Sequence, residues 1–277
     1  MTAGTARLTD RAVVVVGGAD ARAYLQDLVT NDVARLTPAT PLWAGLLSAQ
    51  GKSLFDMILF DGGDVEPGAV LIDVLALAAD ALVKRLTMFR LRRAVTIAPA
   101  PELHVFAAWG APVADLPADP QFARLGQRWI AATAAIDVGL ADYAAHRRAL
   151  GVADSADLLT DRMLWLEANA VELNGVSFTK GCYTGQENTA RMYHRDKLRR
   201  RLLPVTIAGV VDDATITAGG VPVGELRGHD GTRGIAYLKV DAAAHADLMA
   251  GTATVAVDWP AWLPPLPPGT PDHGETA

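Results

Sequence analysis

The only cysteine of the chain, Cys182, lies in the stretch NGVSFTKGCYTGQENTAR, which spans residues 174–191. Lys180 precedes it by two residues, and Gly181 and Gly185 lie on either side of it. An ammonium that reaches a sulfur favours the thiolate, and glycines allow a backbone to approach a ligand closely. The spacing therefore indicates a reactive or metal-binding thiol. The structural alternative is a small buried cysteine in a turn.

The residues after Cys182 predict the start of a helix. Thr184 and Glu187 fit a T-x-x-E capping box ahead of ENTARMYH, residues 187–194. The positive end of this helix dipole would face the sulfur and favour its thiolate form. His194 follows Cys182 by twelve residues. Because a helix rises about 1.5 Å per residue, this histidine lies too far away to form a protease-type pair with the cysteine.

A metal bound at Cys182 would need ligands from outside the chain. One cysteine cannot hold an iron–sulfur cluster alone, since such clusters take about four protein ligands. The sequence also has no C-x-x-C or H-x-x-x-H spacing that would indicate an internal zinc site. The remaining ligands would come from a partner or a small molecule, which favours a role in transfer or assembly.

Several charged groups accompany the motif. A basic run contains Arg191, Arg195, Lys197, Arg199, Arg200 and Arg201, interrupted only by Asp196. In a chain of net charge −6, this run favours an anionic ligand, such as a polyglutamate tail, or an acidic partner, and a solvated helix end is the alternative. Asp56 and Glu167 interrupt apolar segments, where each carboxylate would need a partner unless it lies on the solvent face.

The composition predicts a soluble, reducing, cytoplasmic protein. Hydrophobic residues make up 51% of the 277 residues, which is ample for a packed core. The net negative charge argues against a general nucleic-acid binder. One cysteine cannot form an internal disulfide, and no apolar run reaches the roughly 18 residues that a membrane span needs. An organelle matrix, after removal of a transit peptide, stays open as an alternative.

The pattern of apolar residues predicts an α+β chain that ends in a small antiparallel barrel or sandwich. Residues 111–132 are interpreted as a connection and residues 261–277 as a proline-rich tail. The expected elements are a strand at 11–18, a helix at 21–29 capped by Asp20, a hairpin turning at 50–52, a strand at 69–76, a helix at 79–94, two strands within 95–110, helices at 141–150 and 156–173, and short strands from 202 onward.

The motif K-G-C-[FY]-x-G-Q-E is met by Lys180, Gly181, Cys182, Tyr183, Gly185, Gln186 and Glu187. It resembles the signature of the YgfZ family, folate-binding proteins of iron–sulfur cluster assembly that are related to the aminomethyltransferase (T-protein) of the glycine cleavage system. The hairpin GLLSAQGKSLFDMIL and the segment GELRGHDGTRGIAYLKV are similar to other parts of the family. Ala168, Ala170 and Asn188 depart from its usual residues.

The resemblance implies a three-part ring of two ferredoxin-like α+β units and a C-terminal antiparallel β-barrel around a central cavity. The first unit would comprise residues 1–38 and 130–198, the second residues 39–129, and the barrel residues 199–260. Residues 261–277 would form the tail.

The resemblance also implies a function. Cys182 and Lys180 would form the functional pair, with Cys182 as a metal ligand shared with a partner. Tetrahydrofolate would contact Asp56, Glu167, Tyr183, Gln186 and Arg191. The partners would be an A-type iron–sulfur carrier and client [4Fe–4S] enzymes, without nucleic acid or membrane.

These residues favour an assembly factor over an enzyme. The alternative is a folate-dependent aminomethyl or one-carbon transferase like the T-protein, which needs Asp56 and does not need Cys182. A scaffold that has lost folate is a third possibility.

Overall fold

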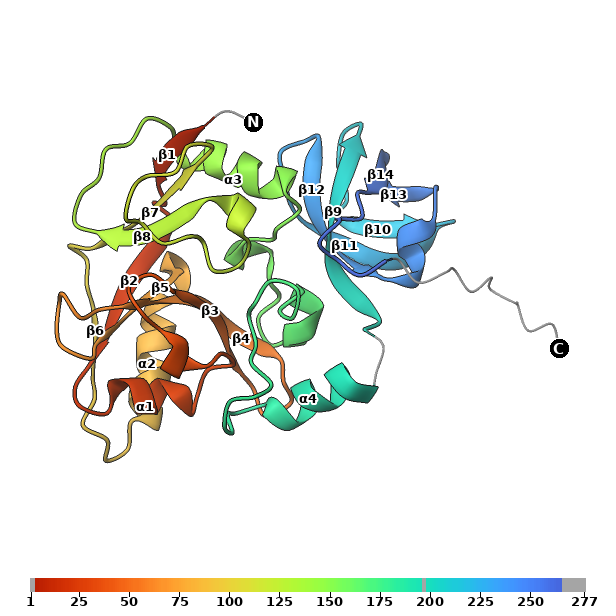
Figure 1. The fold of residues 1–277 in the computed structure, drawn as a ribbon. Coiled ribbons are helices and arrows are strands. Elements are labelled where there is room, and N and C mark those ends of the chain that lie inside the picture. Colours follow the sequence, from red (N-terminus) through yellow and green to blue (C-terminus); the bar gives the residue numbers. More distant parts are fainter. Residues whose placement is uncertain (1–2, 196–197, 266–277) are drawn as a thin grey trace.

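The structure is a computed structural model that describes residues 3–195 and 198–265, apart from the side chain of Arg195 (Figure 1). It contains a five-stranded sheet, a three-stranded sheet and a closed six-stranded barrel. The two sheets lie at the left of Figure 1 and the barrel lies at the right. This arrangement confirms the predicted α+β class with a C-terminal antiparallel barrel.

The five-stranded sheet has the order β3-β4-β5-β2-β6 and is antiparallel throughout. Its strands are β2 (Arg11–Gly17), β3 (Leu42–Leu47), β4 (Ser53–Asp61), β5 (Val70–Leu75) and β6 (Thr96–Pro99). Helices α1 (Ala21–Gln26) and α2 (Ala79–Phe89) share its core, where Val14, Leu25 and Leu82 are fully buried. The valine run of β2 and the hairpin between β3 and β4 are therefore confirmed.

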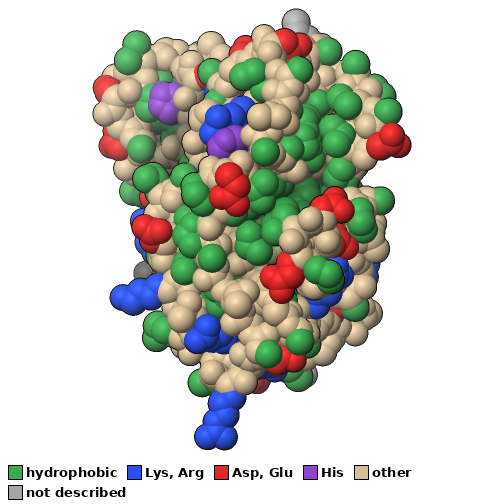
Figure 2. All heavy atoms as spheres, turned by 90° about the vertical axis from the view of Figure 1, so that its left-hand side faces the viewer, with side chains coloured by type: hydrophobic (Ala, Val, Ile, Leu, Met, Phe, Trp, Pro, Cys, Tyr) green, Lys and Arg blue, Asp and Glu red, His purple; other side chains and the backbone are tan. Residues whose placement is uncertain are grey.

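The strand β6 forms one edge of this sheet and ends at Pro99, which cannot donate a ladder hydrogen bond. The side of the molecule that carries β6 and β8, at the left of Figure 1, bears hydrophobic side chains across its middle with charged side chains scattered around them (Figure 2). At the β6 edge on this side, Pro99 hinders pairing with another chain.

The three-stranded sheet has the order β1-β7-β8, and α3 (Leu140–Ala149) packs on β1. Its strands are β1 (Gly4–Arg7), β7 (His104–Trp109) and β8 (Gln127–Ala131). The interpretation of residues 111–132 as a connection was wrong at its end, because β8 forms there. In β8, a buried position is occupied by Arg128, which ion pairs stabilise. A charged residue at a buried position interrupts the apolar alternation by which a strand is predicted.

The helix predicted over residues 156–173 was wrong. The segment forms two short 3-10 turns, Ser155–Asp157 and Trp165–Ala168, and Asn169 then takes a left-handed conformation with φ of 60°. Between them, Leu164 bridges Lys52, and the Ser53 amide donates to the carbonyl of Met163. These bonds to the hairpin lie between the two turns and interrupt the helical pattern there.

The barrel closes in the order β10-β11-β12-β9-β14-β13. Its strands are β9 (Arg200–Ala208), β10 (Thr215–Ala218), β11 (Val221–His229), β12 (Arg233–Lys239), β13 (Leu248–Ala250) and β14 (Ala253–Val257). Leu203, Leu238 and Leu248 are fully buried within it. Helix α4 (Gln186–Arg195) precedes the barrel in the chain, and the remaining 3-10 turns are Val33–Arg35, Ala76–Ala78, Ala123–Leu125 and Asp241–Ala244.

The predicted residue ranges of the two α+β units and of the barrel stay a prediction. Strand β1 pairs with β7, and β2 pairs with β5 and β6, so residues 1–38 contribute to both sheets. Residues 266–277 of the predicted tail lie outside the described residues. Within the described part of the chain, no helix is both long enough and apolar enough to cross a bilayer.

Candidate functional site

Lys180 anchors the cysteine motif to the end of α1. Its side chain is only 8% exposed. The ammonium donates to the backbone carbonyls of Gln26, Val29 and Asn31, with Nζ–O distances of 2.5, 2.5 and 3.0 Å. Burial lowers the pKa of Lys180 to about 8, against the opposing effect of Asp32 and Asp27, so the amine is largely protonated at pH 7. Three donors thus satisfy three carbonyls.

Cys182 is exposed, whereas the residues that flank its loop are buried. Tyr183 is 7% exposed, and the Lys180 ammonium lies 5.1 Å from the centre of its ring. The expectation that Lys180 supports the thiolate by reaching the sulfur is not met in the described residues, because its three N–H groups go to carbonyls. The structural alternative, a buried cysteine, is also wrong.

The motif continues against the hairpin turn between β3 and β4. Gly185 has φ of +84°, and a Cβ there would lie 2.5 Å from the carbonyl oxygen of Ser48, so only glycine fits. Helix α4 begins at Gln186, two residues after the predicted cap Thr184. The Asn188 amide donates to the carbonyl of Gln50 over 2.7 Å. The hairpin therefore fixes the helix that follows Cys182.

Two remaining predicted contacts lie on α4. Gln186 is half-buried in its first turn, and Arg191 is exposed and donates to the Asn188 side chain over 3.2 Å. Both lie near Cys182 along the chain, and their contact with folate stays a prediction.

A pair of tryptophans joins the motif to the predicted carboxylates. The rings of Trp43 and Trp165 have centroids 4.7 Å apart. Trp165 donates from Nε1 to the carbonyl of Gly175, at the start of the motif, over 2.9 Å. Trp43 donates from Nε1 to Asp56 over 3.4 Å. The structure thus brings Asp56 and the motif to two sides of one aromatic pair.

Asp56 is half-buried on β4. Its Oδ2 also accepts a hydrogen bond of 2.8 Å from the hydroxyl of Ser155. Ser155 in turn accepts from the guanidinium of Arg11, which pairs with Asp73 over 2.6 Å. The carboxylate is therefore held by a chain of polar contacts that leads into the interior.

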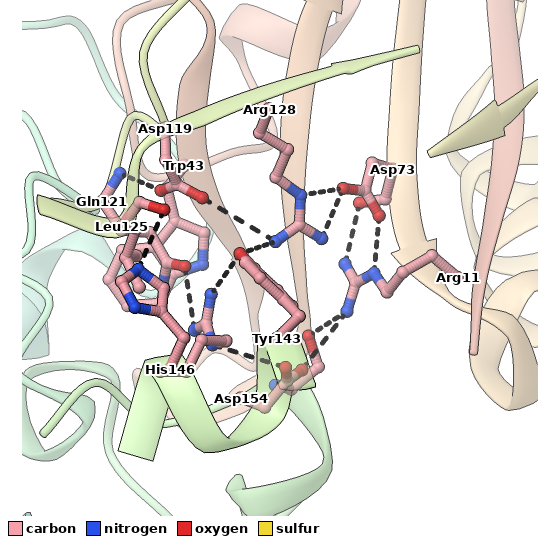
Figure 3. A network of polar contacts seen from close by, with 12 residues as sticks. Arg11, Trp43, Asp73, Asp119, Gln121, Leu125, Arg128, Tyr143, His146 and Asp154 are labelled. Carbon is pink, nitrogen blue, oxygen red and sulfur yellow. Dashed lines mark hydrogen bonds and ion pairs between the residues drawn. The ribbon is translucent and has the colours of Figure 1, made fainter. Parts of the chain in front are cut away.

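Figure 3 shows this interior network, which joins the two sheets and α3. Asp73 of β5 accepts from Arg11 of β2 and, over 2.6 Å, from Arg128 of β8, and it is fully buried. Burial lowers the pKa of Arg128, but Asp73 and other neighbours outweigh it, so the pKa lies above its ordinary value. Arg147 and Asp154 extend the network to α3 and the turn at Ser155.

Glu167 lies in the second 3-10 turn and is 7% exposed. Its Oε2 accepts from the hydroxyl of Tyr237, a barrel residue, over 2.7 Å and from the amide of Leu164 over 2.9 Å. Burial raises the pKa of Glu167 against these two bonds and the charge of Arg200. The solvent-face alternative for this carboxylate is wrong, because it links the turn to the barrel.

Tyr237→Phe is expected to raise the pKa of Glu167 further, because the hydroxyl favours the charged carboxylate. The variant should lose about 1.5 kcal/mol of unfolding free energy at pH 7. At low pH, Glu167 is protonated in the folded and the unfolded chain, so its raised folded pKa has no effect on stability; the cost appears as pH rises to the folded pKa. The loss of unfolding free energy caused by Tyr237→Phe should therefore shrink towards pH 4. Urea unfolding at both pH values measures this. If Tyr237→Phe causes the same loss of unfolding free energy in a Glu167→Gln background, the loss does not come from the hydrogen bond between Tyr237 and Glu167.

The basic run has structural as well as exposed members. Arg201 donates to Asn169 and Glu172, each over 2.8 Å, and so ties β9 to the segment before the motif. Arg200 lies 5.3 Å from the centre of the Tyr237 ring, and Arg199 is exposed. Among the described members, Arg201 is therefore occupied by an ion pair, while Arg191 and Arg199 are exposed. Asp196 and Lys197 lie outside the described residues.

Known proteins resemble this chain along most of its length. The family model described as the CAF17 C-terminal β-barrel domain matches residues 199–265. Two relatives are named "Iron-sulfur cluster assembly factor IBA57, mitochondrial". The mouse protein is 35% identical over 92% of this chain and 85% of its own, and the human protein is 36% identical over 95% and 87%. The chain belongs to the IBA57 family.

Membership in the IBA57 family corrects one expectation. The relatives carry the word mitochondrial in their names, which points to the mitochondrion, so the predicted cytoplasmic location is wrong. The finer assignment to the YgfZ family stays a prediction. A solved structure of glycine cleavage system aminomethyltransferase T from Bartonella henselae has a TM-score of 0.70 over 94% of this chain and 86% of its own, at 13% identity. It confirms the predicted fold.

Sequence reasoning missed several residues that shape this site of the IBA57-family chain. Tyr237, Ser155 and Trp43 contact the predicted carboxylates, yet none carries a local signal. Asp73 did carry one, because it interrupts the apolar strand AVLIDVLA as Asp56 interrupts SLFDMILF. A carboxylate inside an apolar run therefore marks a buried network as readily as a ligand site.

Proposed function

We propose that this chain is an iron–sulfur cluster assembly factor in which Cys182 supplies one thiolate ligand to iron in a site shared with a partner. The observation that carries the proposal is the exposed thiol between two buried anchors, Lys180 and Tyr183. The IBA57 relatives, named as assembly factors, support it.

A single thiolate suits transfer better than storage. The anchors hold the loop in place, so the sulfur is presented without a large ordering cost on binding. In ligand exchange, one Fe–S bond to Cys182 forms as one bond to a carrier ligand breaks, and no electron is gained or lost. Because a cluster needs about four ligands, the chain cannot keep it alone. An A-type carrier and client [4Fe–4S] enzymes are the proposed partners.

Tetrahydrofolate binding is part of the proposal. Asp56 and Glu167 each use Oδ2 or Oε2 for their hydrogen bonds, and their other oxygens make none within the described residues. Each carboxylate can therefore accept a further N–H, as recognition of a pterin requires. When bound, folate would supply one-carbon chemistry or a regulatory signal. Tyr183, Gln186 and Arg191 would contact it from the motif side.

Cys182→Ser is the experiment that tests the assembly role. The variant should abolish rescue of [4Fe–4S] enzyme activity in cells that lack the endogenous factor, because a serine oxygen is a poor ligand for iron in such clusters. The thermal midpoint should stay unchanged, since the side chain is exposed. Full rescue by a stable Cys182→Ser protein would overturn the proposal.

The transferase alternative rests on Asp56, which the fold places beside Trp43. In that case Asp56→Asn would abolish formation of methylene-tetrahydrofolate from an aminomethyl donor, while Cys182→Ser would leave it intact. An assay of methylene-tetrahydrofolate formation by both variants and the unaltered chain separates the two functions, and calorimetry with tetrahydrofolate measures binding alone. Failure of the unaltered chain to bind tetrahydrofolate would remove the folate part and leave the cysteine part standing.

A further inference from the structure

Helix α2 and the 3-10 turn before it carry two stripes of apolar side chains, one buried and one exposed among the described residues. Leu82 and Leu86 are fully buried in the core of the five-stranded sheet. The exposed stripe consists of Leu77 in the 3-10 turn before α2 and of Ala81 and Met88 on α2, with Leu77 95% and Met88 64% exposed. Exposed large apolar side chains that gather in one place commonly mark an interaction surface.

The exposed stripe borders a groove of about 460 Å³ between α2 and the start of β4. Leu54 and Phe55 line its β4 side, and Lys84 and Arg85 line it together with the apolar residues of α2. The surface is thus concave and apolar with basic groups at its rim. We call it the α2 groove.

The charge around the α2 groove is opposite to that of the chain. The two charged side chains that line the groove, Lys84 and Arg85, are both basic, in a protein of net charge −6. The Arg85 guanidinium lies 4.8 Å from the centre of the Phe89 ring. Its Nε is buried and has no hydrogen-bond partner among the described residues. The cationic groups of Lys84 and Arg85 line the groove and can pair with carboxylates of a partner.

The α2 groove lies close to the cysteine motif along β4. Leu54 follows Gly51 by three residues, which is about 10 Å in an extended strand. Gly51 belongs to the turn on which Gly185 packs, with its Cα 3.2 Å from the position that a Gly185 Cβ would take. A partner that fills the groove therefore contacts the same hairpin that positions the motif.

We propose that the α2 groove docks a protein partner through an amphipathic segment whose apolar side chains are flanked by carboxylates. The concave shape receives protruding side chains, as in helix-in-groove recognition, whereas a lipid surface would suit a convex helix face. The inference rests on the proposed function, because the A-type carrier is the partner used as its probe.

The test measures binding of the purified A-type carrier, without cluster, to the full chain by calorimetry. Lys84→Glu/Arg85→Glu and Leu77→Gln/Met88→Gln should each weaken binding about tenfold or more. The matched control is Arg124→Glu/Arg233→Glu, which makes the same charge change at two exposed arginines beside α3 and the barrel, and it should stay within about twofold. Circular dichroism establishes that each variant is folded.

The possible outcomes separate the groove from the cysteine. Because the carrier is used without cluster, its docking is measured without any Fe–S bond to Cys182, so the result does not depend on the cysteine test. If both groove variants keep full affinity, or the carrier does not bind the unaltered chain, the groove proposal falls while the cysteine test stands on its own. Vesicles of phosphatidylserine and phosphatidylcholine form the last arm. Binding to them that Leu77→Gln/Met88→Gln abolishes would assign the groove to a membrane and overturn the proposal.

Discussion

Asp73→Asn is expected to lower the unfolding free energy by about 3–5 kcal/mol, because it leaves buried cations without their counter-ion. Asp73 is fully buried, and the side chains of Arg11 and Arg128 are each 3% exposed. An amide accepts at one oxygen only and turns an NH₂ group towards a guanidinium. At roughly 2 °C per kcal/mol in a chain of this size, the thermal midpoint should fall by about 6–10 °C.

The control for Asp73→Asn is a carboxylate whose ion pair is exposed. Asp27 pairs with Arg93, and their side chains are 56% and 39% exposed. Asp27→Asn should cost less than about 1 kcal/mol, since water and salt screen such a pair. Urea unfolding and calorimetry of both variants measure the contrast. Equal, small losses would show that the network does not join the sheets energetically.

The network also shows why parts of the fold were predictable and others were not. The valine run of β2 and the hairpin at 50–52 follow from local patterns, and the structure forms both. Strand β8 was missed because Arg128 is buried by charge pairing with Asp73, a residue 55 positions away. Local periodicity detects burial of apolar side chains and not burial of ion pairs.

The candidate site also has features that the local sequence predicts and features that it does not. Cys182 is exposed, as a reactive thiol requires, whereas the support expected from Lys180 is not formed. The contacts of Glu167 could not be predicted, because Tyr237 comes from the barrel, 70 positions later. The same holds for Lys180, whose acceptors lie about 150 positions earlier. A motif names its residues, but the partners that decide their roles come from the tertiary fold.

Lys180→Met is expected to separate the structural part of the motif from its chemical part. Methionine keeps the length and packing of the side chain but leaves the carbonyls of Gln26, Val29 and Asn31 without a donor. Each unsatisfied buried carbonyl costs about 1–3 kcal/mol, and partial access to water reduces the total to about 2–4 kcal/mol. Chemical denaturation measures this loss.

The loop should also loosen in Lys180→Met, because its attachment to α1 is gone. Hydrogen exchange of residues 176–185 should accelerate, while exchange in the barrel stays as it was. Cys182→Ser provides the contrast, since it removes the chemistry and leaves the anchor. If Lys180→Met unfolds like the unaltered chain yet abolishes enzyme maturation, then the lysine acts on the cluster and not on the loop. The other outcome is that Lys180→Met loses both stability and enzyme maturation. If a second substitution that rigidifies the loop then restores both, the Lys180 ammonium acts by holding the Cys182 loop in position.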